Sequence, residues 1–419
     1  MVKGTRTSVA ANLPWRSLAA AIFLPNLLFS IGQGAITPVI PVIAHNLGSS
    51  LANAGFVASM LVVGVLVADL PSGALVTRFG ERSGMLAALA LTAIAASAAL
   101  LARSLWMLGL AVFAMGLATA VFYLARHAFL TTSVPFAARA RAMSTLGGTF
   151  RLGFLIGPFL SAWLITATGS PKTALWVQLA ACIAAGIVVL IAQDPREVAE
   201  AHRQTNPTAS PRSTRAGNPP DPIGGGQSRR HALVTVGVGA ATLAALRASR
   251  QVLLPMWGLS LGMSEASIAM VVGMGGAIDV ALFYTGGWAM DRFGRLRVIV
   301  PSMVGLGIGH VVLSFTHDPP NAVSWFIGVV VALSLANGLT AGVLMTLGSD
   351  LADPTDPAPF LATWRFTTDA GQASAPLLIS GVTALASLTL AAFCLGVLGF
   401  AGALILRLSL PRYRATGPD

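Results

Sequence analysis

The chain has 419 residues, of which 55% are hydrophobic and only 10% are charged. A soluble globular protein carries roughly 25% charged residues, so this composition excludes the ordinary soluble classes and indicates an integral membrane protein. Lys and Arg outnumber Asp and Glu by 26 to 15, and the resulting net charge of +11 raises the question of a nucleic-acid partner.

The first half of the chain contains six apolar runs long enough to span a membrane. A spanning helix needs about 20 apolar residues, because its backbone polar groups must all be hydrogen-bonded within the helix. The expected spans are residues 18–44, 54–76, 84–102, 105–130, 143–167 and 173–193. The first run is too long for the apolar region of a signal peptide, so we expect it to be retained as a span.

The second half repeats this organisation after a polar segment. Residues 194–231 are rich in Pro, Ser, Gly and Arg, a composition that predicts a flexible linker. Six further spans are expected at residues 232–257, 266–289, 298–316, 322–348, 360–384 and 386–407. We therefore expect an all-α membrane protein with an N-terminal bundle (1–193), a cytoplasmic linker (194–231) and a C-terminal bundle (232–419).

The positive charges predict the orientation of the chain. Short loops rich in Lys and Arg stay in the cytoplasm. With both termini cytoplasmic, 19 such residues fall on the cytoplasmic side, and only Arg103 and Lys172 fall outside. The net charge is then a topology signal, and we expect a multi-pass protein of a bacterial inner membrane with lipid around it and no nucleic-acid partner.

The two halves are internally similar, which indicates a duplicated structural unit. A shift of 214 residues aligns Pro41 with Pro255, and the Arg-Phe-Gly segment that ends at Gly80 with the one that ends at Gly294. A shift of 218 residues aligns Pro158 with Pro376. Two six-helix halves in parallel register are the simplest interpretation.

Two loops carry a recognisable signature. The loop after the second span reads GALVTRFGER from Gly73, and the loop after the eighth reads GWAMDRFGR from Gly287. Both resemble the G-x-x-x-D-R-x-G-R motif of the major facilitator superfamily. The first copy departs from it, since Thr77 replaces the acidic residue and Glu81 a basic one. The resemblance implies 12 transmembrane helices in two pseudo-symmetric six-helix bundles, and a gating role for Gly73, Arg78, Gly80, Asp291, Arg292 and Gly294.

A second signature lies in the fifth span. Gly153, Gly157 and Pro158 resemble the helix-5 motif of the proton-driven drug antiporters of this superfamily. The alternative is that these small residues only allow close helix packing with a proline bend.

Ionisable residues inside the spans are the main functional signal, because each costs roughly 2.5–3.5 kcal/mol to insert and needs a partner or a cavity. In the superfamily that the chain resembles, spans 2 and 11 face each other, so we expect Asp69 to pair with Arg365 as an inner gate. The alternative is that the two side chains reach the membrane interface separately.

A deeper set of charges is expected to control coupling. Spans 5 and 8 also face each other in the family, so Arg151 is expected to bridge to Asp279 when the cytoplasmic side closes. Asp279 and Asp369 are the candidate proton carriers. The alternative is a static buried network without a transport role.

Span 7 lines the cavity in the family, and its Arg247 and Arg250 share one helical face. Together they could bind a carboxylate or a phosphate. With Gln33, the repeat equivalent of Arg247, and Asp369, they form the expected substrate cavity. Arg126 and His127 are interpreted as caps near the end of span 4, with ligand binding as the alternative, and His310 is interpreted as a packed neutral imidazole.

These observations favour a secondary transporter that exports a small molecule by alternating access, coupled to protons, acting as a monomer. The sequence shows no ATP site, and we expect no cofactor other than the proton gradient, no metal site and no enzymatic activity. The first alternative is a carrier of organic anions, because arginines outnumber the deep aspartates. The second is a transporter-like sensor or a lipid-handling protein.

Overall fold

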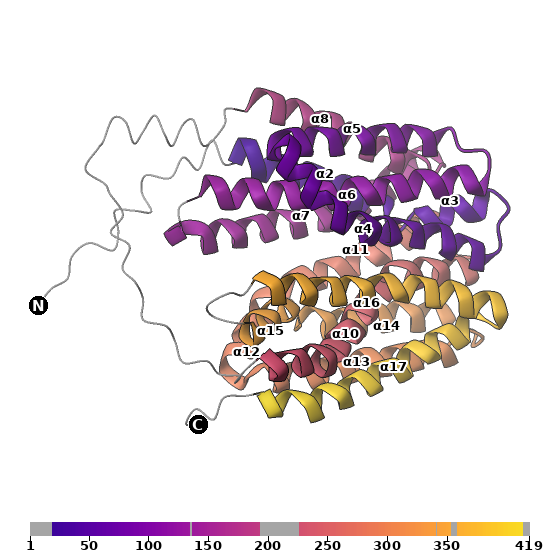
Figure 1. Ribbon diagram of the computed structural model, residues 1–419. Coiled ribbons are helices and arrows are strands. Elements are labelled where there is room, and N and C mark those ends of the chain that lie inside the picture. Colours follow the sequence, from indigo (N-terminus) through magenta and orange to yellow (C-terminus); the bar gives the residue numbers. More distant parts are fainter. Residues whose placement is uncertain (1–18, 135, 193–225, 341, 353–357, 414–419) are drawn as a thin grey trace, which may run out of the picture.

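The computed structural model describes residues 19–134, 136–192, 226–340, 342–352 and 358–413. In this part of the chain all regular structure is helical, and the helices run roughly side by side in two groups (Figure 1). The prediction of an all-α membrane fold in two bundles is confirmed. Most of the predicted linker, residues 193–225, and both chain ends lie outside the described residues.

The N-terminal bundle is built from residues 19–191. Its elements are η1 (Ala19–Phe23), α2 (Leu24–Ile36), α3 (Ile40–Asn46), α4 (Leu51–Phe79), α5 (Glu81–Leu100), α6 (Leu105–Ser133), α7 (Phe136–Thr168) and α8 (Thr173–Ile191). The C-terminal bundle contains α10 (Gly226–Ser260), α11 (Glu265–Ala281), α12 (Phe283–Phe293), α13 (Arg295–Phe315), α14 (Ala322–Gly338), α15 (Val343–Leu351), α16 (Ala358–Leu385), α17 (Leu388–Ser409) and η2 (Leu410–Tyr413).

Each of the twelve expected spans coincides with a helix or a broken helix. Among the described residues, ten spans are long and apolar enough to cross a membrane, and the bent pair α11 and α12, with a 42° bend, would make eleven. Helix α16 falls outside this set, since polar residues such as Asp369 and Gln372 interrupt its apolar sequence. Twelve membrane crossings therefore stay a prediction.

The same helix pairs pack together in both halves, which gives the two bundles their shared plan. In the first half α2 packs on α7 and α8, and α4 packs on α6. Their repeat equivalents in the second half do the same, with α10 on α16 and α17, and α11 on α14. Between the halves, α4 packs on α16 and α7 packs on α11, as expected for spans 2 with 11 and 5 with 8.

The signature loops are tight turns at one end of the molecule, which we call the motif end. Gly80 ends α4 with φ +83°, and Gly294 ends α12 with the same φ of +83°. This left-handed conformation is strained for any residue with a side chain, so glycine lets each pair of helices reverse without a longer loop. The repeated signature is therefore a repeated turn.

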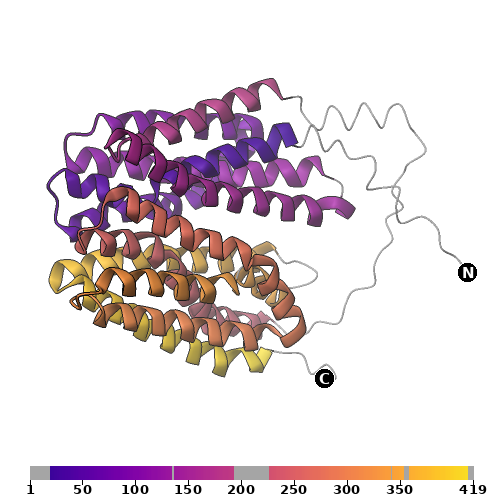
Figure 2. The ribbon, with the colours of Figure 1, turned by 180° about the vertical axis from the view of Figure 1, so that it is seen from behind.

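The opposite end, which we call the distal end, holds the two halves together. There the Asn46 amide donates to Glu265 Oε1 at 2.5 Å, and the Ser380 hydroxyl donates to the Ala52 carbonyl at 2.8 Å. Figure 2 shows the two bundles separating toward the motif end. The molecule is therefore described in a state in which its distal end is closed.

The helix-5 motif brings α7 against α2. A Cβ atom on Gly157 would lie 2.5 Å from the Ala35 nitrogen, and one on Gly153 would lie 2.5 Å from the Ser30 Cβ. Pro158 lies inside α7 and contacts Gly273 of α11 across the interface between the halves. The motif thus allows close packing within the first half and reaches the second.

This packing makes a testable prediction with two variants of one helix. Gly157→Ala places a methyl group against the α2 backbone and should lower stability by about 1–3 kcal/mol. Gly147→Ala, where nothing lies within 4 Å of the added Cβ, should be neutral or slightly stabilising, because alanine favours helix. Thermal unfolding of the purified protein in detergent measures both, and equal midpoints would show that the α2–α7 contact is loose.

Candidate functional site

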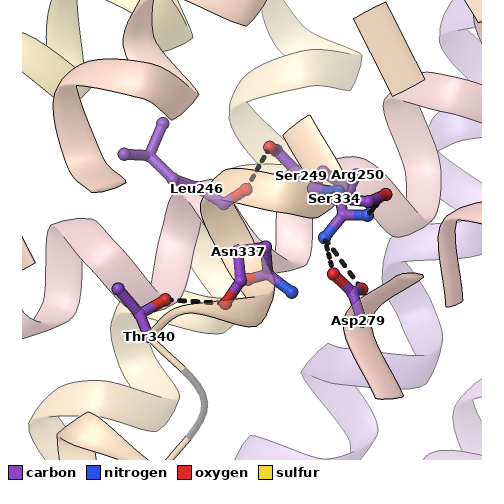
Figure 3. Close-up of polar contacts among 7 residues, drawn as sticks. All are labelled: Leu246, Ser249, Arg250, Asp279, Ser334, Asn337 and Thr340. Atoms are coloured by element: carbon purple, nitrogen blue, oxygen red, sulfur yellow. Dashed lines mark hydrogen bonds and ion pairs between the residues drawn. The ribbon is translucent and has the colours of Figure 1, made fainter. Parts of the chain in front are cut away.

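The interior of the C-terminal half contains a complete ion pair. Arg250 of α10 donates through Nη1 to both carboxylate oxygens of Asp279 in α11, at 3.0 and 3.3 Å. Its Nη2 donates to the Ser334 hydroxyl of α14 at 2.6 Å, as Figure 3 shows for these three side chains. The Arg250 side chain is 9% exposed and that of Asp279 22%. Asp279 is therefore neutralised within its own half.

The predicted bridge between Arg151 and Asp279 is not formed in this state, and its formation in a state with a closed motif end stays a prediction. The Arg151 guanidinium of α7 lies instead over the Phe283 ring of α12, 4.0 Å from its centre. Sequence depth predicts that Arg151 and Asp279 lie at the same level of the membrane. In this state the Asp279 carboxylate is bound by Arg250, which belongs to the same half as Asp279. The predicted bridge was assigned to a closed motif end, whereas here the distal end is closed.

Arg247 lies one turn before Arg250 on α10 and is partly buried. Among the described residues, its guanidinium has no hydrogen-bond or ion-pair partner. It is nevertheless close enough to Arg151, Arg250 and Asp279 for their charges to interact. Since Asp279 is bound to Arg250, Arg151 and Arg247 form an excess of positive charge between the two halves.

Gln33, expected in the substrate cavity, makes its side-chain contact within the N-terminal half. Its amide, on α2, donates to the Thr119 hydroxyl of α6 at 3.0 Å, and the residue is 2% exposed. Gln33 therefore joins two helices of the N-terminal half, and its predicted place in the substrate cavity receives no support from this geometry.

Closer to the motif end, a second charged cluster joins the halves. Arg365 of α16 lies 3.6 Å from Asp69 of α4 and 3.3 Å from Asp369 one turn further along α16. The predicted contact between Asp69 and Arg365 is thus present, and its role as a gate stays a prediction. Asp369 binds Arg365 in this cluster, and its expected places in the substrate cavity and in proton coupling stay predictions.

The interpretation of Arg126 as a helix cap is wrong. Helix α6 continues to Ser133, so Arg126 lies two turns inside it, only 6% exposed. Its guanidinium stacks on Tyr123, at 4.2 Å, and lies 5.5 Å from the centre of the Phe150 ring, while its Nε and Nη1 are buried without a hydrogen-bond partner. Aromatic residues at i−3 on α6 and in α7 were the signal that could have shown a buried position.

His310 is buried as expected, with Nε2 3.0 Å from the Ser249 hydroxyl and Nδ1 2.8 Å from the Leu306 carbonyl. Both ring nitrogens therefore have partners in the C-terminal half. The histidine packs α13 against α10, and nothing in its contacts suggests a ligand.

The charged residues of the signature turns do not join the two bundles in this state. Arg78 lies over Phe79 at 5.5 Å, and Arg292 lies over Trp288 at 5.5 Å. Among the described residues, neither arginine forms an ion pair, and Asp291 forms none. The physical reason is that the motif end is where the bundles diverge, so the expected lock of Gly73, Arg78, Gly80, Asp291, Arg292 and Gly294 is not engaged.

Two repeated helical bundles pack on each other through α4 with α16 and α7 with α11, with charged side chains buried between the helices. The chain belongs to the Major Facilitator Superfamily, whose model matches residues 22–278 and 236–418.

Curated relatives are distant. The chain is 26% identical over 177 residues to an uncharacterized MFS-type transporter of Mycobacterium tuberculosis, MT1926 in strain CDC 1551 / Oshkosh and Rv1877 in strain ATCC 25618 / H37Rv. The match covers 41% of this chain and only 26% of the length of those relatives.

Solved structures resemble nearly the whole chain. The peptide transporter POT in complex with sulfate has a TM-score of 0.76, covering 98% of this chain and 99% of that one at 13% identity. A POT family transporter in complex with a thioalcohol conjugated peptide has a TM-score of 0.75, covering 95% and 96% at 13% identity. At this identity the likeness shows the fold alone.

The buried ion pair makes a stability prediction. Arg250→Ala leaves the Asp279 carboxylate without its partner, and loss of one member of a buried pair costs roughly 3–5 kcal/mol. Arg151→Ala removes only a cation–π contact, worth about 0.5–2 kcal/mol. Thermal unfolding should therefore show a much larger decrease for Arg250→Ala. Equal decreases would mean that Arg250 does not neutralise Asp279.

Proposed function

We propose that the protein carries a small organic anion across the membrane by alternating access. The observation that supports this most strongly is the pair formed by Arg151 and Arg247. The two arginines come from opposite halves, and within the described part of the chain neither forms an ion pair, since the nearby Asp279 is bound to Arg250. A site with this excess charge favours an anionic ligand over a cationic drug.

The physical argument rests on the cost of unpaired charge. Two guanidinium groups near each other in a bundle of low dielectric constant repel, and an anion between them removes the repulsion. A carboxylate or phosphate can accept two parallel hydrogen bonds from each guanidinium, which adds geometric selectivity. Phe283 covers one face of Arg151, so the edge of its guanidinium is the part left to donate.

The solved neighbours agree with an anionic group in this fold. One POT structure contains sulfate and another contains 5-aminolevulinic acid. For the present chain these ligands indicate only a chemical class to test, because the shared identity is 13%.

Proton-coupled export across a bacterial inner membrane, with the motif end in the cytoplasm, is the second part of the proposal. The helix-5 motif of Gly153, Gly157 and Pro158 supports it, because this motif resembles that of the proton-driven drug antiporters. A protein that binds the anion but never moves it would instead be a sensor or a lipid-handling protein. Counterflow in proteoliposomes distinguishes these outcomes.

Arg247 gives the most direct test of the substrate class. In a thermal-shift screen, small mono- and dicarboxylates and organic phosphates should stabilise the wild type more than neutral or cationic analogues of equal size. Arg247→Ala should remove this stabilisation, reducing affinity at least tenfold, without lowering the melting temperature of the free protein. Arg247→Lys keeps the charge but loses the bidentate geometry and should retain part of it. Stabilisation by cationic drugs alone would contradict the proposal.

The proposed orientation is tested by labelling single cysteines in a background with Cys182 and Cys394 replaced by serine. The cysteine of Ser210→Cys, in the predicted linker, should not react with an impermeant reagent added outside the cell, because the arginine-rich side is expected in the cytoplasm. Lys172→Cys, in a predicted external loop, should react. The reverse pattern would show that the topology is inverted, and it would contradict the proposed proton-coupled export.

A further inference from the structure

The cluster formed by Asp69, Arg365 and Asp369 contains two carboxylates and one guanidinium. Arg365 Nη2 lies 3.6 Å from Asp69 Oδ1, and Arg365 Nε lies 3.3 Å from Asp369 Oδ2. The Asp69 side chain is only 14% exposed, and that of Asp369 is 27% exposed. With both carboxylates ionised, the cluster would hold one uncompensated negative charge in the interface between the halves.

One oxygen of this cluster lacks a partner. Asp69 Oδ2 is buried and has no hydrogen-bond donor. The carboxyl groups of Asp69 and Asp369 both lie beside the Arg365 guanidinium, 3.6 and 3.3 Å from its nitrogens, so they are also neighbours of each other. An ionised carboxylate can only accept, so a single proton supplies the missing donor and removes the repulsion between the two groups.

We propose that Asp69 and Asp369 share one proton and together form the proton-binding site of the carrier, with Arg365 held against the carboxylate that stays ionised. This inference rests on the proposed carrier function and names its coupling site. Two carboxyl groups held beside one guanidinium interact, and interacting carboxyl groups bind and release protons as a pair. Asp279 has no such role, because Arg250 already donates to both of its oxygens.

The charged groups on the helices around the cluster are engaged with residues other than the Asp69 and Asp369 carboxyl groups. On α6, Arg126 and His127 act on Arg365. On α10, Arg247 and Arg250 act on Asp279. On the remaining neighbours of α16, Asp350 of α15 pairs with Arg295, and Arg407 of α17 is exposed. His127 is thus the competing titratable group, and the test must separate it from the carboxyl pair.

The position of the pair explains how a proton could control movement. Asp69 belongs to α4 of the N-terminal half and Asp369 to α16 of the C-terminal half, and these helices pack directly on each other. When the halves separate along this contact, the shared hydrogen bond breaks and each carboxyl group meets water alone. Proton occupancy and the contact between the halves are therefore linked.

Infrared difference spectroscopy between two pH values tests the proposal on the full-length protein in lipid vesicles, without any substrate. The wild type should show the carbonyl stretch of a protonated carboxylic acid disappearing at high pH. Asp69→Asn and Asp369→Asn should each remove or shift this same band. Asp279→Asn, Asp291→Asn at an exposed site, and His127→Gln should leave it unchanged. The amide bands and gel filtration show whether each variant is folded.

Three results would overturn the proposal. These are a band lost only in Asp369→Asn and unshifted in Asp69→Asn, a band lost in Asp279→Asn, and a pH response carried by imidazole bands that disappear in His127→Gln. If an Asn variant fails to fold, Asp69→Glu and Asp369→Glu replace it, since each must still shift the shared band. Failure of the anion screen with the shared band intact would defeat the proposed substrate and leave the proton site standing.

Discussion

A charged side chain inside a helical membrane protein must be neutralised by another residue or by a ligand, and this requirement organises the interior of the molecule. Asp279 is satisfied by Arg250 and Ser334 within one half. Asp69 and Asp369 divide Arg365 between them across the interface. Among the residues that the structure describes, Arg151 and Arg247 form no ion pair. The uneven distribution of partners, more than any single residue, indicates where ligands bind.

Both proposed ligands bind where the halves meet. The anion site takes Arg151 from the first half and Arg247 from the second, and the proton site takes Asp69 from the first and Asp369 from the second. A ligand that bridges the halves has a different affinity in each state of the transporter, which is what coupling requires. The closed distal end, held by Asn46 with Glu265, leaves movement at the motif end as the step that such ligands would control.

Hydropathy and the repeated signature were enough to predict the fold, because each depends on local sequence: apolar runs for the helices, and glycines such as Gly80 for the turns. The family resemblance predicted that spans 2 and 11 face each other, and the contact between Asp69 and Arg365 agrees with it. Sequence depth did not predict that Arg250 binds Asp279 in this state, since depth does not give the rotation of a helix about its axis. It failed for Arg126 because span 4 was ended at residue 130, whereas α6 continues to Ser133 and buries the side chain.

The central claim is that an anion completes the charge balance between Arg151 and Arg247. An experimental structure of the protein with a small carboxylate or phosphate that stabilises it tests this most directly. The anionic group should lie within hydrogen-bond distance of both guanidinium groups, while Asp279 remains bound to Arg250. If the anion binds elsewhere and Arg151 is paired with Asp279 in that structure, the account of the site is wrong.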